Sequence, residues 1–327
     1  MTPDPGPTTG SHYPAERPGD IHARPVPHPG RWVGAGVVLV LAAMFVSSLL
    51  TNPRWDLGLA GQIMIQTPVL EGLLKGTIIA TVASMTIGVL LGTLVAVLRL
   101  STNPVMRYLS FLYTWFFRAI PRYVLLTGIG AGLAYLYQQV DVGVPFGQQL
   151  AGALGLSHDL TFFSVDMVTV ANGLVGGIIG LGLSEAAYMA EIARAGILSV
   201  DKGQSEAAEA LGMSRGQVMR RIILPQAMRV IVPPTGNETI AMVKDTSLLI
   251  AIPVISELNF QAMAIGNRMF KVMGGLVAAT VWYLIVCSVL MVIQVYVERY
   301  FGRGFGAERV GAQRNRRYAR AGGMGGA

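Results

Sequence analysis

Four ionisable residues interrupt long apolar stretches of this sequence: Glu185, Glu191, Lys244 and Asp245. A charged side chain among apolar neighbours is costly, so it usually faces another charge or a water-filled cavity. Glu191 can pair with Arg194 three positions later on the same helical face, which favours simple local neutralisation. Glu185 has no basic residue three or four positions away. Glu185 is therefore the strongest candidate for a functional charge.

Lys244 and Asp245 are adjacent, so on a helix their side chains point about 100° apart and do not face each other. We expect each to meet another helix or a locally unwound stretch. Pro233, Pro234 and Gly236 predict a kink at the start of this span, as at many solute pathways. The residues that we expect to line or support a cavity for a zwitterionic solute are Glu185, Asn237, Glu238, Lys244 and Asp245. A purely structural polar network between helices remains an open alternative.

A polar segment, residues 201–225, separates two apolar stretches and carries two helix-start signals. Asp201 with Gln204, and Ser214 with Gln217, each have the spacing of a capping side chain and a returning amide. The segment is therefore predicted to form a helix, a turn and a second helix.

Gly212 fits the position just after the first of these helices, where a positive φ is required. Pro225 is predicted to end the second helix. That helix combines an apolar face with a basic surface; the face is made by Val218, Met219, Ile222 and Ile223, and the surface by Arg215, Arg220 and Arg221. Because so short a pair of helices cannot bury the apolar face alone, we expect it to need a partner.

The composition places these features in a membrane protein. Only 13% of the 327 residues are charged, against ~25% in soluble domains, and 52% are hydrophobic. This composition excludes a disordered chain, a disulfide scaffold and a free nucleic-acid-binding domain, although the net charge is +7. We predict an all-α polytopic membrane protein with about six transmembrane helices and a cytoplasmic helix-turn-helix.

Six apolar stretches are long enough to be read as spans. They are residues 32–50, 73–98, 123–137 (with a start as early as Tyr113 left open), 167–195, 230–256 and 275–297. Residues 1–31 are rich in proline and glycine and are predicted to be a disordered tail. Most of the 25 Lys and Arg residues fall on one predicted side, including Arg118, Arg122 and the basic tail 302–327, so both termini are predicted to be cytoplasmic.

Metal, disulfide and nucleotide chemistry find little support in the sequence. The single cysteine, Cys287, lies in an apolar run, and the four histidines all fall outside the apolar stretches. No phosphate-cradling Gly-x4-Gly-Lys-Ser/Thr motif occurs in the chain. We therefore expect no metal site, no cofactor and no catalytic residues.

The 201–225 segment resembles the EAA loop of ABC-importer permease subunits at every fixed position. The matching residues are Glu206, Ala207, Ala208, Gly212, Ile222, Leu224 and Pro225. Around the loop, stretches such as Lys244-Asp245-Thr246-Ser247-Leu248 are similar to the polar amino acid uptake branch, of the histidine/glutamine type, and the resemblance covers residues 72–301.

This resemblance implies an ABC type I importer permease fold and a set of partners. Residues 201–225 would be a coupling loop that docks on a separate ABC ATPase subunit, which binds and hydrolyses the ATP, so the chain itself would not be an enzyme. A substrate-binding protein would deliver a polar amino acid from outside, a second permease subunit, identical or related, would complete the pathway, and lipid would surround it.

Two departures from the family pattern are visible. The family's usual Phe-Arg-Gly-Thr-Pro is replaced here by Phe-Arg-Ala-Ile-Pro at 117–121, followed by Arg122. The helix at 32–50 and the tail 1–31 are additions that the resemblance does not cover.

Three other functions compete with this interpretation. Residues 210–218 also resemble the turn of a DNA-binding helix-turn-helix, but the pair is joined directly to spans on both sides, so we expect no nucleic-acid partner. A secondary carrier or channel for small polar solutes would need no ATPase and has no reason to carry the EAA spacing. A membrane-tethered interaction protein without transport activity is the third alternative.

Overall fold

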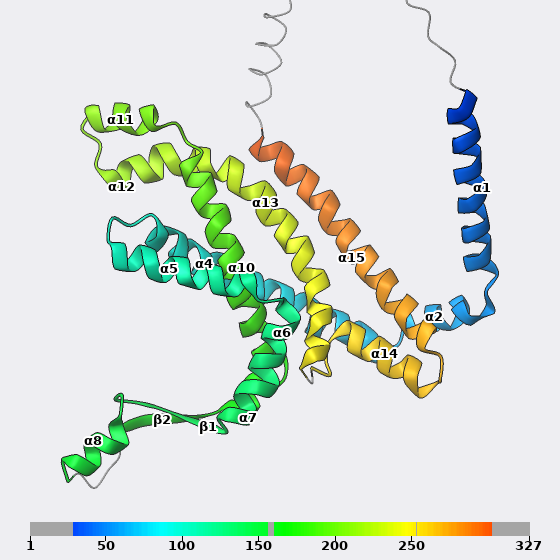
Figure 1. Cartoon of the computed structure of the whole chain (residues 1–327), viewed down its shortest axis with the longest axis horizontal. Helices are drawn as coiled ribbons and strands as arrows, with labels where there is room; N and C mark the ends of the chain where they lie inside the picture. Colours follow the sequence, from blue (N-terminus) through cyan, green and yellow to red (C-terminus); the bar gives the residue numbers. More distant parts are fainter. Residues whose placement is uncertain (1–28, 156–159, 253, 303–327) are drawn as a thin grey trace, which may run out of the picture. The chain divides into compact units, whose positions relative to one another are not determined.

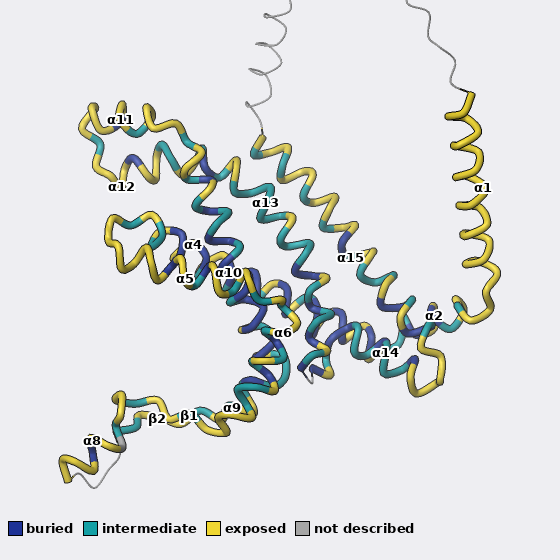
Figure 2. The backbone as a smooth tube through the Cα atoms, viewed as in Figure 1, coloured by how far each residue is buried: buried dark blue, intermediate teal, exposed yellow. Residues whose placement is uncertain are grey.

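The computed structural model describes residues 29–155, 160–252 and 254–302, and the chain divides into two compact units, Met1–Pro53 and Arg54–Ala327. In the first unit, α1 (Pro29–Thr51) is a 23-residue helix in which no residue is buried (Figures 1 and 2). A helix that is apolar on all sides needs lipid or protein around it. Apart from residues 29–31 and 302, the tails predicted at 1–31 and 302–327 lie outside the described residues.

The second unit contains helices, wide turns and one hairpin (Figure 1). In chain order after the short turn η1 (Pro53–Trp55), its elements are α2 (Leu57–Met64), α3 (Thr67–Glu71), η2 (Gly72–Ile78), α4 (Ile79–Arg99), α5 (Pro104–Ala119), α6 (Arg122–Thr127), η3 (Gly128–Leu133), α7 (Ala134–Leu136), β1 (Gln139–Gly143), α8 (Gly147–Ala153), β2 (Thr161–Asp166), α9 (Met167–Ala171), α10 (Leu174–Leu198), α11 (Lys202–Ala210), α12 (Arg215–Val218), η4 (Met219–Ile223), α13 (Leu224–Asp245), η5 (Thr246–Ala251), α14 (Leu258–Arg268) and α15 (Val272–Phe301).

Four helices of the described residues are long and apolar enough to cross a membrane: α1, the continuous helix Thr67–Arg99, α10 and α15. A fifth span results if α5 and the helix Arg122–Leu136, which meet at a bend of 102°, are counted as one. The span predicted at 230–256 does not meet this criterion. Its helix α13 is only weakly apolar, carries the charged residues Arg229, Glu238, Lys244 and Asp245, and ends at Asp245, so the expected total of six spans is not confirmed.

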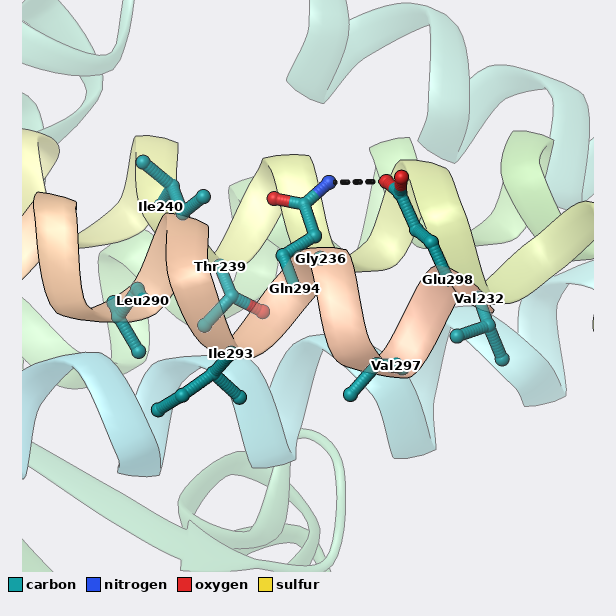
Figure 3. Close-up of a pocket in the computed structure, with 9 residues that line it drawn as sticks. All are labelled: Val232, Gly236, Thr239, Ile240, Leu290, Ile293, Gln294, Val297 and Glu298. Carbon is teal, nitrogen blue, oxygen red and sulfur yellow. Dashed lines mark hydrogen bonds between the residues drawn. The ribbon is translucent and has the colours of Figure 1, made fainter. Parts of the chain in front are cut away.

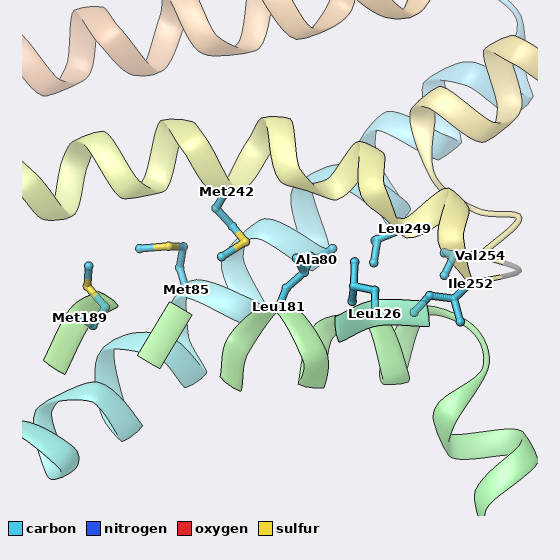
Figure 4. Packing of buried hydrophobic residues seen from close by; sticks show 9 residues of the cluster. All are labelled: Ala80, Met85, Leu126, Leu181, Met189, Met242, Leu249, Ile252 and Val254. Carbon is cyan, nitrogen blue, oxygen red and sulfur yellow. The ribbon is translucent and has the colours of Figure 1, made fainter. Parts of the chain in front are cut away.

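The pairing of α4 with α10 depends on small residues. Gly88 and Gly92 of α4 lie so close to α10 that an added Cβ would be 2.6 Å from Glu185 Cγ or 2.5 Å from Met189 Cβ. Small residues at this spacing are typical of tightly packed membrane helices. The adjoining core joins α4, α6, α10, α13 and η5 (Figure 4); it is made by Ala80, Met85, Leu126, Leu181, Met189, Met242, Leu249, Ile252 and Val254.

Pro225 does not end a helix, contrary to the sequence prediction. The chain remains helical from α12 through the wide turn η4 into α13, with Pro225 in the first turn of α13. A wide turn relieves the clash between a proline ring and the preceding carbonyls, and the missing N–H is least costly in a first turn. Pro233 and Pro234 lie inside α13, and the helical form changes only at Thr246, where η5 begins.

The loop between α7 and α9 contains a β-hairpin that the sequence analysis did not predict. β1 pairs with β2 in antiparallel fashion, with an irregularity between Val142 and Gly143. At the end of β2, the Asp166 carboxylate caps α9 by accepting hydrogen bonds from the Thr169 hydroxyl and the Val168 amide. The hydroxyl of Thr169 is the main cause of the lowered pKa of Asp166.

Candidate functional site

The loop at 201–225 is built by local hydrogen bonds. Asp201 caps α11 by accepting from the Gly203 amide at 2.7 Å. At the other end Gly212 has φ +81, and its amide donates to Glu209 O at 2.9 Å while the Met213 amide donates to Ala208 O at 3.1 Å. These paired bonds are the pattern of a glycine-terminated helix, so Gly212 has the conformation predicted for it.

The second helix of the loop begins at a reciprocal cap. The Ser214 amide donates to Gln217 Oε1 at 2.9 Å, in agreement with the predicted capping box. The only buried side chains of α11 and α12 are Ala208 and Val218. The pair therefore has almost no core of its own and offers most of its surface to a partner.

The residues matched to the EAA loop lie along this surface. Glu206, Ala207, Gly212, Leu224 and Pro225 are exposed, Ile222 is half-buried and Ala208 is buried. Leu211, at the tip between the helices, is 84% exposed, and the sequence analysis missed it. Arg215, Arg220 and Arg221 are exposed as well. The loop thus presents an apolar tip beside basic side chains.

A second site, the Arg122 cluster, consists of Arg122, Glu185, Glu238 and Asp245. Arg122 Nη2 donates to Glu185 Oε2 at 2.8 Å, and Arg122 Nη1 donates to Asp245 Oδ2. Glu238 Oε2 lies 3.9 Å from Arg122 Nη2. One guanidinium thus holds three carboxylates from two helices, α10 and α13.

The Arg122 cluster is largely shielded from solvent. The Glu185 side chain is fully buried and that of Arg122 is 12% exposed. The ring of Tyr188, one turn along α10, lies 4.9 Å from Arg122 Cζ, within range for a cation–π contact. Glu185 Oε1 is buried and has no hydrogen-bond partner among the described residues. Buried polar atoms are rarely left unpaired, so this oxygen is the least satisfied atom of the cluster.

The backbone explains how Arg122 reaches the cluster. Pro121 precedes α6 and disfavours helix in Ile120, so α5 ends and the chain turns by 102°. Arg122 is consequently the first residue of α6, and its side chain points back towards α10 and α13. The sequence analysis counted Arg122 among the basic residues of the cytoplasmic side, and the structure adds that its guanidinium lies between helices, paired with acids.

The structure separates the five residues predicted to line a cavity. Glu185, Glu238 and Asp245 come together around Arg122. Asn237 faces α15 instead, where Gln294 Nε2 donates to its Oδ1 at 2.9 Å. Lys244 is exposed and forms no ion pair within the described part of the chain. The adjacent positions of Lys244 and Asp245 on the helix account for this divergence.

Gln294 also borders a cavity between α13 and α15. This cavity has a volume of about 150 Å³, and the dashed line in Figure 3 marks the hydrogen bond from Gln294 to Glu298, 2.7 Å long. A larger space of about 380 Å³ lies beside it among α4, α10 and α13, lined mainly by aliphatic residues with Thr93, Thr235 and Thr239. α13 is thus bordered from Leu224 to Ile240 by two mainly apolar cavities, and neither of the two is lined by a residue of the Arg122 cluster.

Comparisons with known proteins agree with this geometry. Residues 88–303 match the family described as "Binding-protein-dependent transport system inner membrane component". The arginine transport system permease protein ArgU of Corynebacterium glutamicum is 43% identical over 289 residues, covering 88% of this chain and 85% of that protein. The L-cystine transport system permease protein TcyB of Bacillus subtilis is 32% identical over 238 residues, covering 72% and 88%.

Among solved structures, the one described as "Crystal structure of an amino acid ABC transporter with histidines" aligns with a TM-score of 0.56 and 27% identity. The alignment covers 71% of this chain and 94% of that one. The resemblance and the fold class inferred from the sequence are thereby confirmed.

Proposed function

The chain belongs to the family of binding-protein-dependent transport system inner membrane components, and from this premise we propose that it carries a cationic amino acid inward, coupled to an ATPase through residues 201–225. Its relatives are amino-acid ABC transporter permeases, and it is a multi-pass membrane protein. ATP hydrolysis belongs to the separate ATPase subunit, so the chain is not itself an enzyme.

The observation that carries the proposal is the exposed loop α11–α12. It combines the EAA spacing with a fixed turn at Gly212 and almost no internal core. A rigid, solvent-facing helix pair joined directly to α10 and α13 suits the transmission of motion from a soluble partner to those helices. Glu206, Ala207, Ala208, Gly212, Ile222, Leu224 and Pro225 are the proposed contact and turn residues.

The substrate class follows from the Arg122 cluster. Three carboxyl groups face one guanidinium in this cluster, and the two on α13 are partly exposed, so the cluster has more acids than cations to pair with them. A cation on the substrate would relieve this excess. The similarity to a permease named for arginine transport supports the same choice. We place Asn237 and Lys244 beside this pathway rather than in the cation site.

The remaining partners and the orientation complete the proposal. A second permease subunit, identical or related, forms the other half of the pathway, and an extracytoplasmic binding protein delivers the amino acid. Both termini and the α11–α12 loop are on the cytoplasmic side, as the distribution of Lys and Arg indicates. Within the second unit, the loop and the β1–β2 hairpin lie at opposite ends (Figure 1), which fits opposite sides of a membrane.

The test is reconstitution. The chain is assembled in vesicles with its ATPase and binding protein, and ATP-dependent uptake is measured for L-arginine and for L-citrulline, which has nearly the same shape without the charge. We expect uptake of arginine and little uptake of citrulline. Arginine uptake that persists without ATP would contradict coupling to the ATPase, and equal uptake of the two compounds would contradict the substrate class.

A further inference from the structure

The position of Arg122 resembles that of a bound ligand more than that of a structural ion pair. Its guanidinium bridges Glu185 and Asp245 and lies over the face of Tyr188. Two carboxylates with an aromatic ring form the surroundings that proteins offer to a guanidinium or ammonium group from outside. The chain's own arginine therefore fills a subsite suited to a cation.

The subsite is incompletely satisfied by Arg122 alone. Glu185 is fully buried, yet its Oε1 accepts no hydrogen bond from the described residues. An oxygen in this state lacks a donor that a second or repositioned cation could supply. The charges of the cluster also favour a further cation. The cluster has more carboxylates than guanidinium groups, so one more positive group would reduce its net charge rather than add repulsion.

We propose, on the basis of the function proposed above, that Arg122 is an internal stand-in for the cationic side chain of the substrate: it occupies the subsite of Glu185, Asp245 and Tyr188 while no substrate is bound, and the incoming cation displaces it. Arg122 thereby sets both selectivity and release. Only a cation that pairs with two carboxylates competes with Arg122 for the subsite. When the Arg122 guanidinium returns to the subsite, it expels the bound cation.

The local structure allows Arg122 to leave and return. α6 has six residues and is followed by the wide turn η3, Gly128–Leu133. α6 itself is anchored, because Leu126 is fully buried in the core and a Cβ on Gly130 in η3 would lie 2.1 Å from Ile252 Cγ2. The movement is therefore a change of rotamer of the long Arg122 side chain at the start of α6.

Glu238 provides a place for the displaced guanidinium. Its Oε2 lies 3.9 Å from Arg122 Nη2, too far for a hydrogen bond but within one small rotation of the side chain. The Glu238 side chain is 27% exposed, whereas that of Glu185 is fully buried. The guanidinium therefore moves from the buried carboxylate to the more exposed one and stays paired while the substrate cation takes its place.

The experiment is direct binding and transport with the assembled transporter in lipid nanodiscs and vesicles. Equilibrium binding of radiolabelled L-arginine to the permease is compared for wild type, Arg122→Ala and Arg118→Ala. If Arg122 fills the subsite nine-tenths of the time, its removal tightens arginine binding by about tenfold. Turnover should fall in the same variant, because nothing expels the bound cation. Binding of L-citrulline should not tighten.

Arg118→Ala is the matched control. Arg118 is exposed and its Cζ lies 5.5 Å from the same Tyr188 ring, but it forms no ion pair among the described residues. We expect its removal to leave arginine affinity unchanged. Equal tightening in both variants would overturn the proposal, since it would then reflect total charge rather than the subsite.

A further variant covers the case in which Arg122→Ala fails to fold. Lysine keeps the charge but cannot bridge two carboxylates, so Arg122→Lys should tighten arginine binding by less than Arg122→Ala but measurably. Weaker or unchanged binding in a folded variant would show that Arg122 is structural or part of the substrate site. Absence of ATP-dependent arginine uptake by the wild type would instead refute the proposed function, so the two failures are distinguishable.

Discussion

The α11–α12 loop and the Arg122 cluster satisfy their polar groups in opposite ways. In the loop, the caps join residues two to five positions apart and most side chains face solvent. In the cluster, Arg122 meets partners 63 and 123 residues away, and the side chains are mostly buried. The loop buries little of its surface against the rest of the chain, whereas the cluster is held together by contacts that link three elements.

This difference assigns different tasks to the two regions. A loop that keeps its shape by local bonds can dock and undock without losing its structure, as a coupling element must. A cluster that links α6, α10 and α13 changes whenever these helices move. Substitutions in the loop should therefore uncouple transport while leaving substrate preference intact, and substitutions around the cluster should alter substrate preference.

The largest effect is expected for Gly212→Val. A left-handed conformation costs a residue with a side chain roughly 1–2 kcal/mol, and more when it is β-branched, so the turn at φ +81 would open. We expect ATP-dependent uptake to fall to background while the permease still folds and binds substrate. Uptake and substrate-stimulated ATP hydrolysis in reconstituted vesicles provide the measurement.

Gly216→Val is the control for this prediction. Gly216 lies four residues away in α12, has open space around its Cα and does not adopt a positive φ. The change should therefore act only through helix propensity and favour α12 slightly, by about 0.3 kcal/mol, because valine is a better helix former than glycine. If Gly212→Val retained coupling, or if both variants lost it equally, the turn would not be the critical feature of the loop.

A smaller but selective effect is expected for Gly88→Ala. The added methyl group would lie 2.6 Å from Glu185 Cγ, so Glu185 must shift relative to Arg122. Gly92→Ala disturbs the same helix pair through Met189 and Ala186 without touching Glu185. Both should lower thermal stability, but only Gly88→Ala should change the ratio of arginine to citrulline binding. Identical ratios in the two variants would show that the cluster does not set preference.

Much of the loop could be predicted from the sequence, because its signals are local. Gly212 and the Ser214–Gln217 pair act within one or two turns of helix, and the structure has them as the spacing indicated. Pro225 shows the limit of the same reasoning. A proline usually ends a helix, but the wide turn η4 absorbs it, and nothing in the neighbouring residues announced that turn.

The cluster could be predicted only in part. Glu185 stood out because it lacks a local partner, and that signal was sound, but the partner depends on the bend between α5 and α6 and on the distant position of Asp245. The count of Lys and Arg residues on each side of the membrane named no partner for Arg122, since such a count ignores where the chain turns. Two features of the sequence together indicate the Arg122–Glu185 pair. Glu185 is an acidic residue without a local partner, and Arg122 is a basic residue directly after a proline.

A further comparison is provided by Glu257, a buried carboxylate held by neutral donors only. Its Oε1 accepts from the Thr77 hydroxyl at 2.9 Å and the Tyr283 hydroxyl at 2.5 Å, and its Oε2 caps α14 through the amides of Asn259 and Phe260. In Glu257→Gln the amide oxygen would keep the cap on Asn259 and Phe260, and the N–H2 group would face the hydroxyls of Thr77 and Tyr283, whose buried protons would lose their acceptor; this should destabilise the fold by about 2 kcal/mol. The thermal unfolding of the purified transporter measures this.

Because no cation is involved, Glu257→Gln should leave the preference for arginine over citrulline unchanged. The exposed pair Glu71–Lys75, 3.0 Å apart, supplies the control, since Glu71→Gln should cost under about 1 kcal/mol. A changed preference in Glu257→Gln would mean that any buried carboxylate influences selectivity, and the contrast between charge-paired and neutral sites would fail.

The smallest effect is expected for Gln217→Ala, which tests how local the loop is. Gln217 Oε1 accepts from the Ser214 amide at the start of α12. An exposed bond of this kind contributes about 0.5–1 kcal/mol, so hydrogen exchange of the first amides of α12 should quicken by about two- to fivefold.

Gln204 has the same predicted role in α11, but Asp201 caps there by accepting from Gly203, and no returning bond from Gln204 occurs among the described residues. Gln204→Ala should therefore leave exchange in α11 unchanged. Faster exchange that spreads from α12 into α13 in the Gln217 variant would show that the loop and the membrane helix unfold as one unit, and the loop would then not be locally organised.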